Sequence, residues 1–108
     1  MQNTGEKFGA LRKGLLEFAI LRVICTRKLY AAEMLQHLAG SEFATQEGTL
    51  YPLLSRMRRE RLVDYEWQDS DAGPPRKYYR LTDRGRDALT ELQGYWQHLT
   101  DTLNRLGN

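Results

Sequence analysis

One short stretch of the chain alternates between apolar and polar residues, while the segments on both sides of it repeat with helical spacing. Residues 63–68 (VDYEWQ) have this period of two, which is typical of a half-buried β-strand. Residues 68–75 (QDSDAGPP) then carry the residue types of a turn, and residues 77–81 (KYYRL) return as a second strand. The predicted class is therefore mainly α with a small β-hairpin.

Three helices are predicted ahead of this hairpin. In residues 11–26 the apolar positions occupy more than one face, so this helix should be buried on two sides, and its second side suggests a partner surface. Residues 30–39 form a short helix with one apolar face, which Gly40 ends. Thr49 is expected to cap a third helix, which places Pro52 in the first turn, where a missing N–H has no partner to lose.

A long helix is predicted after the hairpin. Thr82 and Asp83 have the residue types of a helix start, and the apolar pattern continues to about Leu106. The apolar residues recur at alternating intervals of three and four, as they do at the seam of a coiled coil. Because the helix is longer than a small core requires, a two-fold dimer is the economical way to cover them. The predicted dimerisation residues are Leu89, Leu92, Trp96, Leu99, Leu103 and Leu106.

The predicted order of elements is the layout of a winged helix-turn-helix with an added C-terminal helix. With 108 residues, the chain forms one domain and at most an appendage. We assign residues 1–81 to a winged helix-turn-helix DNA-binding domain and residues 82–108 to a C-terminal dimerisation helix. The polar, glycine-spaced residues 1–10 are expected to be poorly ordered.

The composition narrows the class of protein further. A lone cysteine, Cys25, cannot form an internal disulfide, and the apolar stretch 15–25 is too short to span a bilayer, so we expect a cytoplasmic protein. His37 and His98 fall in different predicted helices, and no spacing in the chain matches a metal site. The chain has no glycine-rich phosphate loop. We therefore expect no enzymatic activity, no cofactor and no metal.

The predicted third helix has an outward face rich in arginine. Apolar residues at positions 50, 53, 54 and 57 share one face and fill the core, while the opposite face carries Ser55, Arg56 and Arg59, flanked by Tyr51 and Arg58. In helix-turn-helix proteins this helix enters the major groove, where arginine binds guanine edges or phosphates and hydroxyl groups bind phosphates. The alternative is a solvated face that only keeps the protein in solution.

Two further cations, Arg76 and Lys77, are expected at the tip of the hairpin. In a winged-helix layout they lie beside the arginine face, and the two groups together form a basic strip suited to a phosphate backbone. The net charge is only +2, so the placement of the cations predicts double-stranded DNA as the partner, rather than their number. The alternative is a tip that is basic by chance, with the prolines before it stiffening a turn.

Three blocks of sequence resemble the PadR family of bacterial transcriptional regulators. Residues 48–63 (GTLYPLLSRMRRERLV) are similar to that family's third helix, residues 73–85 (GPPRKYYRLTDRG) to its wing, and residues 11–24 (LRKGLLEFAILRVI) to its first helix. The resemblance, which covers about residues 11–106, implies a homodimeric winged-helix repressor that binds promoter DNA. Pro74 stands where the family usually has a basic residue, which implies fewer phosphate contacts from the wing and a stiffer tip.

The resemblance also implies roles for single residues. It places Thr49, Tyr51 and Arg56 in the DNA-reading helix, and Arg76 and Lys77 in the wing. It further implies release of the DNA by a small aromatic or other hydrophobic effector, without naming one. Combined with the outward face of the third helix, the candidate DNA-binding residues are Thr49, Tyr51, Ser55, Arg56, Arg59, Arg76 and Lys77.

Trp96 lies in the middle of the predicted dimer seam. It is a candidate wall of the effector site, although packing is the more common role of such a tryptophan, and packing is also favoured for Tyr65, Trp67 and Tyr95. We predict a dimeric repressor that binds an inverted-repeat operator. Two other functions stay open: a winged helix that binds a protein instead of DNA, and a carrier of small hydrophobic ligands. The carrier would leave the arginine face and the basic wing without a purpose.

Overall fold

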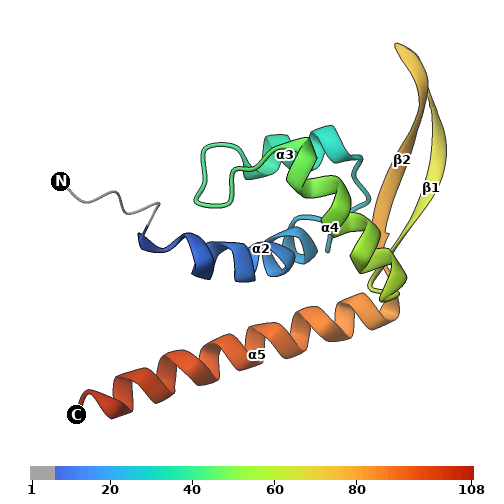
Figure 1. Cartoon of the computed structure of the whole chain (residues 1–108). Helices are drawn as coiled ribbons and strands as arrows, with labels where there is room; N and C mark the ends of the chain where they lie inside the picture. The colour runs from blue at the N-terminus through green and yellow to red at the C-terminus, as the bar shows by residue number, and fades with distance from the viewer. Residues whose placement is uncertain (1–6) are drawn as a thin grey trace.

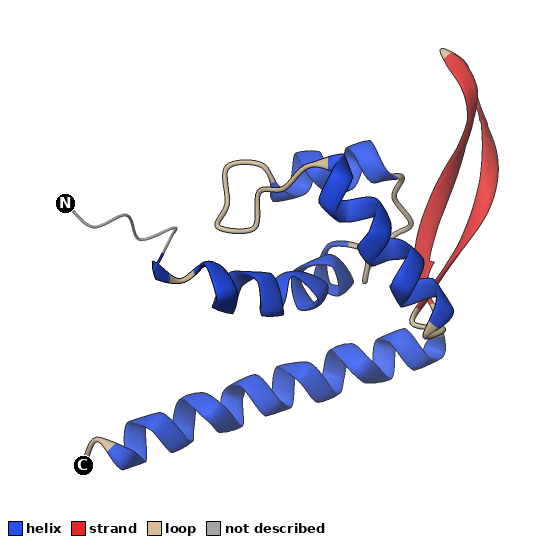
Figure 2. Ribbon diagram, viewed as in Figure 1, coloured by secondary structure: helices blue, strands red, loops and turns tan. Residues whose placement is uncertain are grey.

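A computed structural model describes residues 7–108 of the chain (Figure 1). Its elements are, in order, α2 (Gly9–Val23), α3 (Ala31–Leu38), α4 (Glu47–Arg59), β1 (Val63–Ser70), β2 (Gly73–Leu81) and α5 (Asp83–Leu106). The predicted class, a mainly helical winged helix-turn-helix with a C-terminal helix, is confirmed (Figure 2). The expectation of poor order in residues 1–10 concerns residues 1–6, which lie outside the described residues, and residues 7–10, of which Phe8 is the N-cap of α2 and residues 9–10 belong to the helix.

The core lies where α2, α3 and α4 meet the base of the hairpin. Removing apolar side chains from water there is the main favourable contribution to folding. Leu53, which was predicted on the core face of α4, is partly buried at the edge of this core. The side chains without any exposed surface are Ile20, Leu21, Met34, Leu50, Leu54 and Met57.

The connection between α3 and α4 follows the prediction at its start and departs from it at its end. Gly40 has a φ of +78°, the left-handed conformation that favours glycine just after a helix, and it ends α3 as predicted. Thr49, however, does not cap α4. The helix begins three residues earlier, and the carbonyl of Gln46 accepts from the backbone N–H groups of Thr49 and Leu50, both at 3.0 Å.

This earlier start changes the position of Pro52. The proline lies inside α4 rather than in its first turn. Because proline has no N–H, the carbonyl of Gly48 receives no helical hydrogen bond from position 52. Gly48 is exposed, so water can satisfy that carbonyl. The predicted cap was wrong because backbone bonds to Gln46 close the first turn without any side-chain hydrogen bond.

The hairpin is longer than predicted. β1 and β2 pair antiparallel from Val63 opposite Leu81 to Ser70 opposite Gly73, so the strands extend into the segment that was expected to be a turn. The pairing is irregular between these strands where Asp69 opposes Pro74 and Pro75. Prolines lack the N–H that a ladder needs, and a bulge accommodates them.

This register corrects the expected position of the two wing cations. Arg76 lies opposite Gln68 and Lys77 opposite Trp67, so both are on the strand and not at the tip. The hairpin projects away from the helices (Figure 2), and its tip is formed by Asp71 and Ala72. These two cations can therefore contact a partner molecule with the side of the wing and not with its tip.

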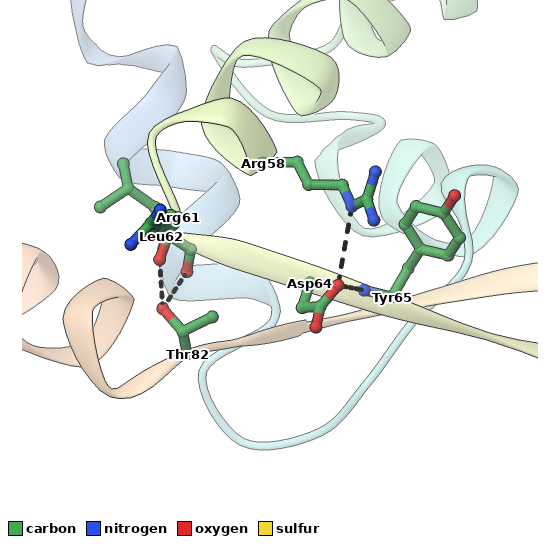
Figure 3. A network of polar contacts seen from close by, with 6 residues as sticks. All are labelled: Arg58, Arg61, Leu62, Asp64, Tyr65 and Thr82. Carbon is green, nitrogen blue, oxygen red and sulfur yellow. Dashed lines mark hydrogen bonds and ion pairs between the residues drawn. The ribbon is translucent and has the colours of Figure 1, made fainter.

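The base of the hairpin is fixed to the body from two directions. Leu29, between α2 and α3, exchanges two backbone hydrogen bonds with Tyr79 of β2, at 3.0 and 2.8 Å. On the other side, the hydroxyl of Thr82 donates to the carbonyl of Arg61 at 2.6 Å (Figure 3) and accepts from the N–H of Gly85 at 3.0 Å, which confirms Thr82 as the cap of α5. The angle at which the wing leaves the body is thereby restrained.

The apolar stripe along α5 leaves the core as the helix proceeds. Leu89 is 8% exposed and packs in the core, whereas Trp96 is 42%, Leu103 68% and Leu106 76% exposed. The helix runs beside α2 and antiparallel to it (Figure 1). Leu11 on α2 is also exposed, and α2 ends at Val23 rather than near residue 26. Within residues 7–108, much of the stripe therefore has no cover.

Candidate nucleic-acid interface

The outer face of α4 presents polar and cationic groups opposite its buried leucines. Ser55 and Arg59 are exposed there, and Tyr51, on the flank toward the wing, is 47% exposed. The side chain of Arg59 forms no ion pair or hydrogen bond with any residue in the described part of the chain. An unpaired guanidinium can bind a phosphate without first giving up a partner.

Arg56, in contrast, is held by two carboxylates. It lies on the flank of α4 that faces α2, where its guanidinium pairs with Glu17 of α2 at 3.0 Å and with Glu60 at 3.3 Å. Thr49 lines the same groove between α2 and α4. The structure therefore divides the predicted helix residues: Tyr51 and Ser55 face outward or toward the wing, and Thr49 and Arg56 face α2. Arg59 lies between the two groups and lines both the groove toward α2 and the pocket toward the wing.

Arg58 joins α4 to the first strand of the wing. Its Nε lies 3.6 Å from a carboxylate oxygen of Asp64 (Figure 3), and its guanidinium stacks 4.4 Å from the ring centre of Tyr65. Tyr65 packs against the core, as predicted. A cation that is both paired and stacked holds one geometry better than a single surface ion pair does. Arg58 thus braces the wing against α4 rather than pointing freely to solvent.

The two wing cations rest on aromatic rings and not on acids. The guanidinium of Arg76 lies 4.4 Å from the ring centre of Tyr30, and the Nζ of Lys77 lies 4.7 Å from that of Tyr65 and 5.3 Å from that of Trp67. Within residues 7–108 neither cation forms an ion pair with a carboxylate. Cation–π contacts orient these side chains and leave their charge available to an anion.

The acidic side chain in the middle of the wing is neutralised separately. Glu66 accepts from Lys28, and this hydrogen bond, together with one from Gln68, holds the pKa of Glu66 below its usual value. Glu66 therefore stays ionised and paired at neutral pH. The pKa of Tyr79, a buried residue of the core, is shifted in the other direction, because burial raises the pKa of its hydroxyl.

Aromatic residues that were not predicted to contact DNA complete this surface. Tyr30, at the start of α3, supports Arg76, and Trp67 on β1 is 61% exposed although packing was predicted for it. Tyr95 is likewise 61% exposed on α5. Trp67 escapes packing because the hairpin extends past the core. A period-two pattern reports which side of a strand a residue occupies, but not how far the strand continues beyond the body.

Two negative findings limit the chemistry of the described chain. Across residues 7–108, no three or more histidine, cysteine, aspartate or glutamate side chains are grouped so that they could hold a metal ion. The same residues contain no helix with the length and hydropathy of a membrane span. The cationic surface beside α4 and the wing is the feature of this fold that indicates a function.

A helix-turn-helix whose second helix lies beside a cationic wing defines the class of winged-helix DNA-binding transcriptional regulators. The chain belongs to the PadR-like family of transcriptional regulators, because that family's model matches residues 20–91. The resemblance seen in the sequence is thus confirmed. Membership makes the protein a DNA-binding transcriptional regulator and not an enzyme.

Similar proteins agree with this assignment. A PadR-like transcription factor from Bacteroides fragilis is 40% identical, with a TM-score of 0.81 over 94% of this chain and 98% of that one. A PadR family regulator from Eggerthella lenta is 31% identical, with a TM-score of 0.85 over 94% of this chain and 89% of the other. The transcriptional regulator Rv3488 of Mycobacterium tuberculosis is 32% identical over 80 residues, 74% of each chain.

Proposed function

We propose that this protein is a homodimeric repressor, acting in the cytoplasm, that binds an inverted-repeat operator in promoter DNA. The observation that carries the proposal is the surface formed by α4 and the side of the wing, where cations without acidic partners converge. Such a surface fits a phosphate backbone and repels itself in the absence of an anion. Its proposed DNA contacts are Tyr51, Ser55, Arg59, Arg76 and Lys77, with Thr49 and Arg56 at its edge toward α2.

Replacing Arg59 or Lys77 by alanine is expected to weaken DNA binding and to flatten its salt dependence. Each substitution removes one phosphate contact from each subunit and so two from the dimer, and the slope of log affinity against log salt should fall in magnitude by about 2. The measurement is fluorescence anisotropy on a duplex from upstream of the protein's own gene, at several salt concentrations. Arg105→Ala, which removes the same charge from the far end of α5, is the matched control. Equal slopes for all three variants would contradict these assignments.

Glu17→Gln is expected to tighten DNA binding. In the free protein the Arg56 guanidinium is paired with the Glu17 carboxylate, so a DNA phosphate has to compete with that carboxylate for the cation. A half-exposed ion pair is worth up to about 1 kcal/mol, so its loss should raise affinity by roughly two- to fivefold for each subunit of the dimer. The same anisotropy titration measures this change. Weaker binding would mean instead that Glu17 holds Arg56 in the orientation that DNA requires.

The proposed dimer rests on the uncovered stripe of α5. Apolar side chains that leave the core at regular coiled-coil spacing are covered economically by a second copy of the helix. We therefore propose residues 82–108 as the dimerisation helix, although Leu89 and the first turns of α5 also pack on the body formed by residues up to 81. A two-fold dimer presents two reading helices, and the matching DNA is an inverted repeat.

The proposed effector site is the groove between α2 and α5. This groove of about 300 Å³ is lined almost entirely by apolar side chains, among them Leu11, Phe18 and Trp96. A small flat hydrophobic ligand fits such a lining, and Trp96 offers it a ring to stack on. A ligand in this groove would act on the dimer seam and so on the distance between the two reading helices. Repression follows if the bound dimer occupies promoter DNA until the effector arrives.

A further inference from the structure

Trp67 is a large aromatic side chain whose position the fold does not explain by packing. It lies on β1 opposite Lys77 and is 61% exposed, although a tryptophan gains more than most side chains from leaving water. Its ring is not loose, because Tyr65 meets it edge-on at 6.1 Å and Lys77 lies over it. An exposed but well-held aromatic ring is typical of a contact surface.

Trp67 forms one wall of a crevice between the wing and the helix-turn-helix. The crevice has a volume of about 320 Å³, and its other walls include Tyr30 at the start of α3, Tyr51 of α4 and Pro75 of β2. Arg76 and Lys77 complete the lining, which contains no acidic residue. Aromatic walls with two cations and no counter-charge are complementary to a ligand that is anionic at one end and apolar at the other.

We propose that this crevice holds one nucleotide unit of the DNA backbone beside the wing. Trp67 and Tyr51 contact the deoxyribose, whose carbon–hydrogen surface is apolar, while Arg76 and Lys77 bind the adjacent phosphate. The inference rests on the proposed DNA surface and deepens it, because the crevice is continuous with the outer face of α4 through Tyr51. In an intact duplex the bases stay stacked, so the sugar and phosphate are the parts that reach a crevice beside the groove.

The two halves of this site contribute to affinity in different ways. Lys77 neutralises a phosphate and releases counterions, so its contribution weakens as salt increases. Trp67 removes apolar surface from water and carries no charge, so its contribution is the same at low and high salt. The stacking of Lys77 and Arg76 on aromatic rings holds both cations in place before DNA arrives.

The test compares Trp67→Ala with Lys77→Ala on the duplex from upstream of the protein's own gene. Trp67→Ala should weaken binding by about tenfold at every salt concentration while leaving the salt slope unchanged, whereas Lys77→Ala should change the slope. Trp67→Phe, which keeps an apolar ring, should recover most of the affinity. Wild-type affinity in Trp67→Ala would overturn the proposal while leaving the rest of the DNA surface in place. A wild-type protein that binds no duplex, even at low salt, would overturn the DNA surface itself.

A second measurement follows Trp67 directly. The chain has two tryptophans, so Trp96→Phe leaves Trp67 as the only one. Acrylamide, a neutral quencher that DNA does not repel, should quench the fluorescence of Trp67 strongly in the free protein and several-fold less in the complex with DNA. Quenching that is unchanged at saturating DNA would show that the ring stays in water and would overturn the proposal.

Discussion

Leu103→Glu is expected to convert the protein to a monomer and to lower its affinity for the operator by about 100-fold or more, because simultaneous binding to two half-sites contributes at least that factor. Leu103 is 68% exposed in the single chain, so a charge there leaves the fold of each subunit intact. In a seam the same charge would be buried against an apolar partner, which is strongly unfavourable. Sedimentation measures the mass, and anisotropy measures the binding.

The control for this variant places the same charge elsewhere on the helix. Thr90→Glu lies on the side of α5 away from the apolar stripe and is exposed, so it should leave the dimer and its DNA affinity unchanged. A Leu103→Glu protein that still sediments as a dimer would show that the stripe is not the seam. Monomers that keep full operator affinity would separate dimerisation from DNA recognition.

Gly85→Ala is expected to destabilise the fold more than any other small substitution considered for this chain. A β-carbon at position 85 would lie 2.0 Å from the carbonyl oxygen of Leu62, far inside van der Waals contact. That oxygen cannot retreat easily, because it accepts from both the N–H and the hydroxyl of Thr82, each at 3.1 Å. We expect the free energy of unfolding to fall by about 3 kcal/mol and Tm by on the order of 15 °C.

Gly94→Ala is the matched control in the same helix. No heavy atom lies within 4 Å of a β-carbon added there, and the position is exposed, so the substitution only adds helix propensity. Thermal and urea unfolding should show it to be more stable than the wild type by up to about 1 kcal/mol. If Gly85→Ala were as stable as the wild type, the start of α5 would not be packed on the β1 junction as described.

Local signals in the sequence predicted the fold well wherever they act within a few residues. Gly40 ends α3 because glycine adopts the left-handed backbone conformation easily. Thr82 begins α5 because its hydroxyl accepts a hydrogen bond from the N–H three residues later. The start of α4 was misplaced because Thr49 looked like a cap, whereas backbone bonds alone close that turn at Gln46. The hairpin tip was misplaced because Pro74 looked like a turn residue, and a bulge allowed it to stay in the strand.

The residues of the candidate site could be predicted from the sequence, but the ion pairs and ring contacts that they form could not. The cations of α4 and the wing were identified from their spacing, yet nothing in the sequence indicates that Arg56 meets Glu17, which is 39 residues away. The aromatic supports of the wing were missed for the same reason, since Tyr30 reaches Arg76 only through tertiary packing. Which charges are free to bind DNA depends on such long-range contacts, and a single sequence does not report them.

The central claim, that this protein is a dimeric reader of promoter DNA, is tested most directly by sequencing the genomic DNA fragments that the purified protein retains at near-physiological salt. The predicted result is strong enrichment of promoter fragments that share an inverted repeat, with half-sites spaced by about one helical turn or a multiple of it. Retained fragments that match the input at every salt concentration, with no shared sequence, would contradict the claim.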